Sequence, residues 1–144
     1  AFENTAIWFG AYYKNKLIGC LRVIPNAAEV SRYLALSIKP NSVETNRMCI
    51  AKEHRRSLVI ALMTLKGFFY CIKNGYTTVY GTVAPKTVGR LLRLGWQRTG
   101  VEFKYEASDP ETCVLLSLSI TKIGVTLYIL RSILDLAKRN IRRY

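Results

Sequence analysis

One helical pattern, over residues 58–72, constrains the fold of this chain more than any other feature. Its apolar side chains recur at helical spacing, and Asn74 and Gly75 follow it as a C-terminal cap. Strand-like runs flank the pattern at residues 43–51 and 77–83. The apolar stripe of the helix consists of Leu58, Leu62, Leu65, Phe69 and Ile72. A strand–helix–strand unit of this kind predicts a sheet that carries helices on its faces.

The remaining predicted elements place hairpins on either side of this unit. In chain order they are strands at residues 7–13 and 17–24, short helices at 29–36 and 87–94, strands at 96–105 and 113–118, and an amphipathic helix at 120–141. Pro85 opens the second short helix and Gly95 closes it. We therefore predict an α/β (α+β) fold with a mixed sheet and helices on both faces. At 144 residues, without a linker or repeat, the chain is expected to be one domain.

Charge is the strongest compositional signal. Lysine and arginine number 22 against 9 aspartate and glutamate, which gives a formal net charge of +13. Such a field attracts a polyanion: nucleic acid, an anionic membrane or an acidic protein. No apolar run reaches the roughly 18 residues of a membrane span, and no secretory signal opens the sequence. We expect a cytoplasmic protein without a transmembrane segment, and a trimmed or incomplete N-terminus because the chain starts at Ala1.

The four cysteines do not predict a metal site. They lie far apart in apolar stretches, no C-x-x-C pair occurs, and His54 is the single histidine. A zinc site needs such ligands at close spacing. We expect no metal, no permanently bound cofactor, and buried, reduced thiols at Cys20, Cys49, Cys71 and Cys113.

Three segments resemble the acyl-homoserine-lactone synthases and the related N-acyl amino acid synthases. Residues 19–25, GCLRVIP, are similar to the G-C-x-R-L-x-P strand of these enzymes. Residues 43–48, VETNRM, are similar to their W-E-x-S/T-R-F strand. Residues 88–96, VGRLLRLGW, resemble their helix-to-strand stretch that ends in R-x-G-W. The matches occur in family order and cover most of the chain, from Trp8 to Leu118.

This resemblance implies a GNAT-like acyltransferase fold with a splayed sheet, and an enzyme. Members of this branch move a fatty acyl group from acyl-carrier protein to an amine. The acceptor is S-adenosylmethionine in homoserine-lactone synthesis, which makes autoinducers for quorum sensing, and a free amino acid in the other branch. For this chain the resemblance implies the acyl-phosphopantetheine of carrier protein as donor, and it leaves the two acceptors open.

The resemblance assigns the catalytic role to Glu44 and Arg47, with Arg22 in support. Aminolysis of a thioester needs a deprotonated amine and a stabilised oxyanion. Glu44 would attract the acceptor ammonium or take its proton, and backbone N–H groups at residues 48–51 would bind the oxyanion. Because side chains alternate along a strand, Arg47 can serve the same site as Glu44 only if a twist or bulge intervenes. The residues alone leave a surface ion pair between Glu44 and Arg47 as the alternative.

The donor is inferred from the turn that precedes the long helix. Acetyl-CoA-dependent relatives cradle the pyrophosphate with R/Q-x-x-G-x-G/A, whereas residues 56–61 read RSLVIA. Val59 stands in place of the first glycine and obstructs the close approach of phosphates. This favours an acidic acyl-carrier protein as partner. The basic residues expected to meet it are Lys52, Arg55, Arg56, Arg90 and Arg93.

An acyl chain needs an apolar slot, which we expect between the third and fourth strands and the long helix. Its predicted lining is Met48, Ile50, Leu62, Phe69, Val79 and Val83. Two departures from the family pattern concern the acceptor: the N-terminal block with paired aspartates is missing, and Asn46 replaces the usual serine or threonine. The alternative functions are an acetyl-CoA-dependent N-acetyltransferase and a non-catalytic nucleic-acid-binding domain that uses the basic face.

Overall fold

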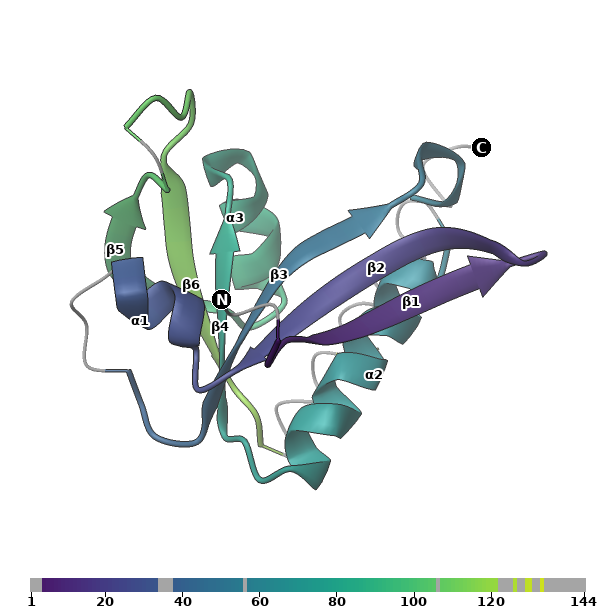
Figure 1. Cartoon of the computed structure of the whole chain (residues 1–144), viewed down its shortest axis with the longest axis horizontal. Helices are drawn as coiled ribbons and strands as arrows, with labels where there is room; N and C mark the ends of the chain where they lie inside the picture. The colour runs from purple at the N-terminus through teal and green to yellow at the C-terminus, as the bar shows by residue number, and fades with distance from the viewer. Residues whose placement is uncertain are drawn as a thin grey trace.

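The chain folds around a six-stranded mixed sheet with strand order β1-β2-β3-β4-β6-β5 (Figure 1). The computed structural model describes residues 4–33, 38–55, 57–105, 107–121, 126, 129, 130 and 133. The elements are β1 (Ile7–Tyr13), β2 (Lys16–Pro25), α1 (Ala28–Tyr33), β3 (Ser42–Ile50), η1 (Lys52–His54), α2 (Val59–Lys73), β4 (Thr78–Val83), α3 (Pro85–Arg93), β5 (Gln97–Phe103) and β6 (Cys113–Ser119).

The predicted order of strands and helices is confirmed as far as β6, with small shifts at the ends of elements. The strand–helix–strand unit joins β3 and β4 as parallel neighbours, paired from Ser42 with Thr78 to Thr45 with Gly81. The other neighbouring strands pair in antiparallel fashion, so the sheet is mixed as expected. The helix predicted at residues 120–141 lies almost entirely outside the described residues. In the described part of the chain no helix is long and apolar enough to cross a membrane.

Helices cover both faces of the sheet, as predicted (Figure 1). Neighbouring residues of β4 show the two layers, because successive side chains of a strand point to opposite faces. Val79 packs with Phe68 of α2 and Val88 of α3 in the larger core cluster. Tyr80 packs with Val30 of α1 in the smaller one.

The face with which α2 packs on the sheet differs from the predicted stripe. Leu62 and Phe69 are 60 % and 61 % exposed, and Leu58 is exposed as well. Because the helix is apolar on several sides, the prediction from residue spacing alone identified the wrong face as buried. Gly67 explains the choice, because a Cβ there would stand 3.1 Å from Leu21 Cδ2, so the bare backbone allows close approach. The buried side of α2 consists of Met63, Thr64, Gly67, Phe68 and Cys71.

Beyond their short paired stretch, β3 and β4 diverge, and β3 carries a bulge where they part. Cys20 pairs with Cys49 and Arg22 pairs with Asn46, so β3 has one residue more than β2 in this interval. Arg47 lies within it and adopts a left-handed backbone with φ of 50°. A bulge of this kind bends a strand and redirects its side chains. The expected irregularity is therefore present, although it does not bring Glu44 and Arg47 to one cavity wall.

Candidate active site

A cavity of about 400 Å³ fills the space between the diverging strands. Its walls come from β3 and β4, from α2, and from α3 with the turn that follows it. The apolar part includes Leu21, Phe68, Leu91, Leu94 and Trp96. The polar part includes Thr45, Asn46, Arg47, Thr64, Thr82, Thr87 and Arg90. A mainly apolar hollow with a few polar side chains is typical of a small-molecule site.

Trp96 closes part of this cavity against the backbone of β4. A Cβ on Gly81 would stand 3.0 Å from two ring carbons of Trp96, so only a glycine lets the ring approach so closely. The ring is nearly buried and belongs to the larger core cluster. Trp96, which ends one of the segments that carried the family resemblance, thus contributes a wall of the cavity.

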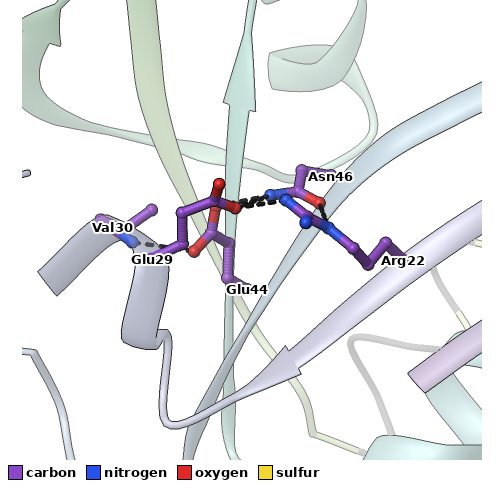
Figure 2. Close-up of polar contacts among 5 residues, drawn as sticks. All are labelled: Arg22, Glu29, Val30, Glu44 and Asn46. Atoms are coloured by element: carbon purple, nitrogen blue, oxygen red, sulfur yellow. Dashed lines mark hydrogen bonds and ion pairs between the residues drawn. The ribbon is translucent and has the colours of Figure 1, made fainter. Parts of the chain in front are cut away.

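On the opposite face of the sheet, Glu44 lies at the centre of a buried polar network (Figure 2). Its Oε2 accepts a hydrogen bond of 2.9 Å from the backbone N–H of Val30, in the first turn of α1. Its Oε1 accepts one of 2.8 Å from the side-chain amide of Asn46. The same amide donates to Glu29 Oε2 at 2.8 Å. Arg22 completes the network, since its Nε donates to Asn46 Oδ1 at 2.7 Å and it forms an ion pair with Glu29.

The network holds two carboxylates against one guanidinium, and all three are shielded from solvent. Glu44 is 0 % exposed and Arg22 is 2 % exposed, while Glu29 retains 14 % exposure of its side chain. Burial, together with the charge of nearby Glu29, raises the pKa of Glu44 to about 7. The hydrogen bonds from Val30 and Asn46 and the charge of Arg22 oppose this shift without cancelling it. A carboxyl group with such a pKa can exchange a proton near neutrality.

Asn46 connects this network with the cavity. It lines the cavity and also bonds to Arg22, Glu29 and Glu44. Glu44 itself does not line the cavity. Arg22 and Glu44 are therefore brought together as predicted, and the buried network contradicts the alternative of a surface ion pair.

Arg47 lies at the cavity. It is exposed, it lines the cavity, and its carbonyl accepts a weak hydrogen bond from Cys20 Sγ at 3.6 Å. Arg47 thus lies on the cavity side of the sheet, opposite Glu44 as strand alternation gives, while Glu44 remains on the face that α1 covers.

The predicted basic residues occupy different positions around the cavity. Arg90 on α3 is half-buried and lines it. Lys52 and Arg55 are exposed in the connection between β3 and α2, where Arg55 Nε donates to the carbonyl of Ile50 at 3.1 Å. Arg93 is exposed and does not line the cavity. Arg56 lies outside the described residues.

The predicted acyl-chain lining is only partly at the cavity. Met48 and Val83 line it. Leu62 and Phe69 do not, because they lie on the exposed side of α2. Val79 is sealed in the core, and the half-buried Ile50 packs against that core instead of lining the cavity.

Two residues of the buried network, Glu29 and Asn46, were not among the predicted site residues. Glu29 is one of only 9 acidic residues and closely follows the strand that carries Arg22.

The expectation of buried thiols holds for Cys71 alone. All four cysteines are free, but Cys49 is exposed, and Cys20 and Cys113 are half-buried. Among the residues that the structure describes, no group of three His, Cys, Asp or Glu could hold a metal ion.

The splayed mixed sheet with helices on both faces is the fold of the GNAT acyltransferases, and acetyltransferases of that family match this chain in structure. Among solved structures, the CoA-dependent acyl-homoserine lactone synthase BjaI, in complex with SAM and isopentyl-CoA, matches with a TM-score of 0.69 at 14% identity. The match covers 88% of this chain and 64% of BjaI, so this chain spans less than two thirds of that enzyme.

Two further structures extend this comparison. The CoA-dependent acyl-homoserine lactone synthase MesI matches with a TM-score of 0.67 at 20% identity, over 89% of this chain and 69% of MesI. FeeM, an N-acyl amino acid synthase from uncultured soil microbes, matches with a TM-score of 0.62 at 15% identity, over 80% of this chain and 72% of FeeM. No protein-family model and no curated protein matches the sequence. The fold implied by the three sequence segments is thus confirmed.

Proposed function

We propose that this chain is an N-acyltransferase that moves an acyl group from a phosphopantetheine thioester to an amine. The cavity between β3 and β4, beside the bulge at Arg47, is the observation that carries this proposal. A pantetheine arm is an extended, uncharged chain, and it fits a slot that opens where two strands separate. The apolar walls at Phe68, Leu91 and Trp96 suit the acyl chain attached to it.

The reaction follows from the groups on the two faces of β3. The acceptor nitrogen attacks the thioester carbonyl, a C–N bond forms, and collapse of the tetrahedral intermediate breaks the C–S bond. Backbone N–H groups of residues 48 and 50, next to the bulge, would stabilise the oxyanion, because those of Cys49 and Ala51 pair with β2. Glu29 and Glu44 outnumber Arg22 in charge, so this face attracts an ammonium group.

Glu44 is the base in this proposal. Because its carboxylate is fully buried, the proton of the acceptor ammonium reaches it through water or through Glu29, which is partly exposed. The pKa of about 7 leaves a substantial ionised fraction near neutral pH and a usable affinity for the proton. The departing thiolate takes up a proton at the end of the reaction.

For the donor we propose acyl-carrier protein. Val59 opens α2 at the position where a glycine would admit a pyrophosphate, and Lys52 and Arg55 present positive charge beside it. Coenzyme A is the second candidate, because BjaI and MesI are described as CoA-dependent. Both donors carry the same phosphopantetheine arm, so the cavity serves either one.

For the acceptor, S-adenosylmethionine and a free amino acid are both consistent with the site. BjaI was crystallised with SAM, and FeeM is an N-acyl amino acid synthase. Each acceptor offers an α-amino group that would meet the carboxylates of Glu29 and Glu44.

A matrix of donors and acceptors tests the proposal. Purified protein is mixed with octanoyl-carrier protein or octanoyl-CoA, each with SAM or with a pool of amino acids, and products are identified by mass spectrometry. We expect an N-acylated product together with stoichiometric release of thiol. The matched control is Glu44→Gln, which should give no product. Absence of product in every combination, with the protein folded, would overturn the proposal.

A further inference from the structure

Cys20 and Cys49 lie directly opposite each other on the antiparallel strands β2 and β3. Both are free, Cys49 is exposed and Cys20 is half-buried. Their neighbours Gly19 and Ile50 face α2, because a Cβ on Gly19 would stand 2.8 Å from Ile50 Cδ1 and 2.9 Å from Met63 Sδ. Since side chains alternate along a strand, both thiols project from the other face of the sheet.

The backbone spacing at this pair suits a disulfide. The N–H of Ala51 donates to the carbonyl of Ile18 at 2.8 Å, and hydrogen-bonded pairs recur at every second residue of an antiparallel ladder. Cys20 and Cys49 are the next such pair, for which the Cα atoms stand about 5.5 Å apart. This lies within the Cα range of disulfides, about 4.4 to 6.8 Å. Directly opposite Cβ atoms stand about 4.5–5.5 Å apart and a disulfide needs about 3.5–4.5 Å, so closure draws the strands together and gives a strained bond that is readily reduced.

We propose that Cys20 and Cys49 form a redox-modification site that closes reversibly to a disulfide. The oxidant is a small-molecule disulfide of the glutathione class. The exposed Cys49 thiolate attacks it, forms a mixed disulfide and releases one thiol. The Cys20 thiolate then attacks the sulfur of Cys49 and releases the second thiol, so the cysteines lose two electrons and two protons and one oxidant molecule becomes two thiols.

The position of the pair gives its oxidation a structural consequence. Cys20 Sγ donates to the carbonyl of Arg47 in the bulge, and a disulfide removes this donor. The new bond also ties β2 to β3 beside Arg47 and Met48, which line the cavity. We therefore expect slower acyl transfer by the oxidised protein. This consequence depends on the proposed function, whereas the formation of the disulfide does not.

The other two cysteines serve as internal controls. Cys71 is buried on α2, where burial raises its pKa to about 12. Cys113 is half-buried on β6, and burial raises its pKa as well. Neither faces a second cysteine across a strand pair of the described sheet.

Peptide mapping tests the site without any activity measurement. The reduced full chain is equilibrated with graded ratios of reduced to oxidised glutathione, trapped with N-ethylmaleimide and digested with trypsin. We expect residues 17–22 and 48–52 to appear as one cross-linked peptide that dithiothreitol separates, and the intact mass measured before alkylation to fall by two hydrogens. The cross-link should persist in Cys113→Ser and disappear in Cys49→Ser.

Three results would overturn the proposal. These are a mixed disulfide with glutathione that persists on Cys49, a disulfide-linked dimer, or full alkylation of both Cys20 and Cys49 at every ratio. Because the mapping is done on the unmodified sequence, the test stands even if a serine variant fails to fold.

Discussion

The side-chain amide of Asn46 donates a hydrogen bond of 2.8 Å to Glu44 Oε1. This bond joins a carboxylate on the α1 face of the sheet to a residue that also lines the cavity on the other side. The two halves of the proposed reaction, the acceptor amine and the acyl thioester, would thus meet across β3. The C–N bond can form only where the two reactants are in direct contact, and Asn46 places the Glu44 network beside the opening in which they would meet.

Replacement of Glu44 tests its role as base. We expect Glu44→Gln to lower acyl transfer by about 100-fold or more, since loss of a general base removes a factor of this order. Glutamine fills the same volume, so the circular dichroism spectrum should not change. The matched control is Glu111→Gln, which should keep full activity because Glu111 is an exposed residue that pairs with Lys86. Near-normal turnover of Glu44→Gln would exclude Glu44 as the base.

The pH dependence of stability follows from the raised pKa of Glu44. The folded state holds its proton up to about pH 7, while the unfolded state releases it near the ordinary value of 4.5. Stability therefore falls as pH rises between these values, by on the order of 3 kcal/mol in full. Urea unfolding at pH 5 and pH 8 should show this loss in the native protein and a smaller one in Glu44→Gln. Equal loss in both proteins would contradict the raised pKa.

Asn46 should be essential to the stability of the buried network. Asn46→Ala removes the acceptor of Arg22 Nε and one of the donors to each of Glu29 and Glu44. We expect the free energy of unfolding to fall by about 1–3 kcal/mol, the cost of buried polar groups that lose their partners. Asn74→Ala removes one bond to the exposed end of α2 and serves as the control with a smaller effect. A loss no larger than the control's would show that the network does not depend on Asn46.

Filling the cavity should block the acyl donor. Thr64 lines the cavity, and its hydroxyl bonds only within α2, to the carbonyl of Ile60 at 2.9 Å. We expect Thr64→Phe to raise the KM for a long-chain donor by about 10-fold, because steric exclusion from a pocket costs roughly 1–3 kcal/mol. Leu62→Ala on the exposed side of the same helix should leave KM unchanged. A raised KM in Leu62→Ala with an unchanged KM in Thr64→Phe would indicate that the acyl chain binds on the outer face of α2.

Charge reversal at Arg55, one of the basic residues predicted to meet the carrier protein, distinguishes the two donors. We expect Arg55→Glu to raise the KM for acyl-carrier protein at low salt, with a smaller difference at high salt because exposed charges are screened. The KM for acyl-CoA should change less. Arg98→Glu makes the same change of net charge on β5, at the far edge of the sheet, and is the control. Equal effects of the two variants would argue against a specific contact near Arg55.

Periodicity and turn residues predicted the order of the elements well. Gly95 ended the second short helix, and the β-branched run at residues 77–83 marked β4. The burial of α2 could not be predicted in this way, because its apolar residues occupy several sides. Close approach at Gly67 selects the buried side, and that depends on Leu21, far away in the sequence.

The residues of the candidate site could be predicted where they lie in the segments that resemble the synthases. Glu44 and Arg22 lie in the two strands that carry the matching segments, and they meet as expected. Glu29 and Asn46 were missed because their role appears only when α1, β2 and β3 come together. Arg47 lies beside the cavity on the face opposite Glu44, as strand alternation gives, so the bulge does not bring these two residues to one cavity wall.

Binding of a non-hydrolysable donor would show whether a pantetheine arm enters the cavity between β3 and β4. An octanoyl-pantetheine thioether, which carries the arm common to both donors, is titrated into the native protein and Thr64→Phe by calorimetry. We expect saturable one-to-one binding by the native protein and strongly weakened binding by Thr64→Phe. Absence of binding to the native protein, or equal binding to both proteins, would contradict a pantetheine site between β3 and β4.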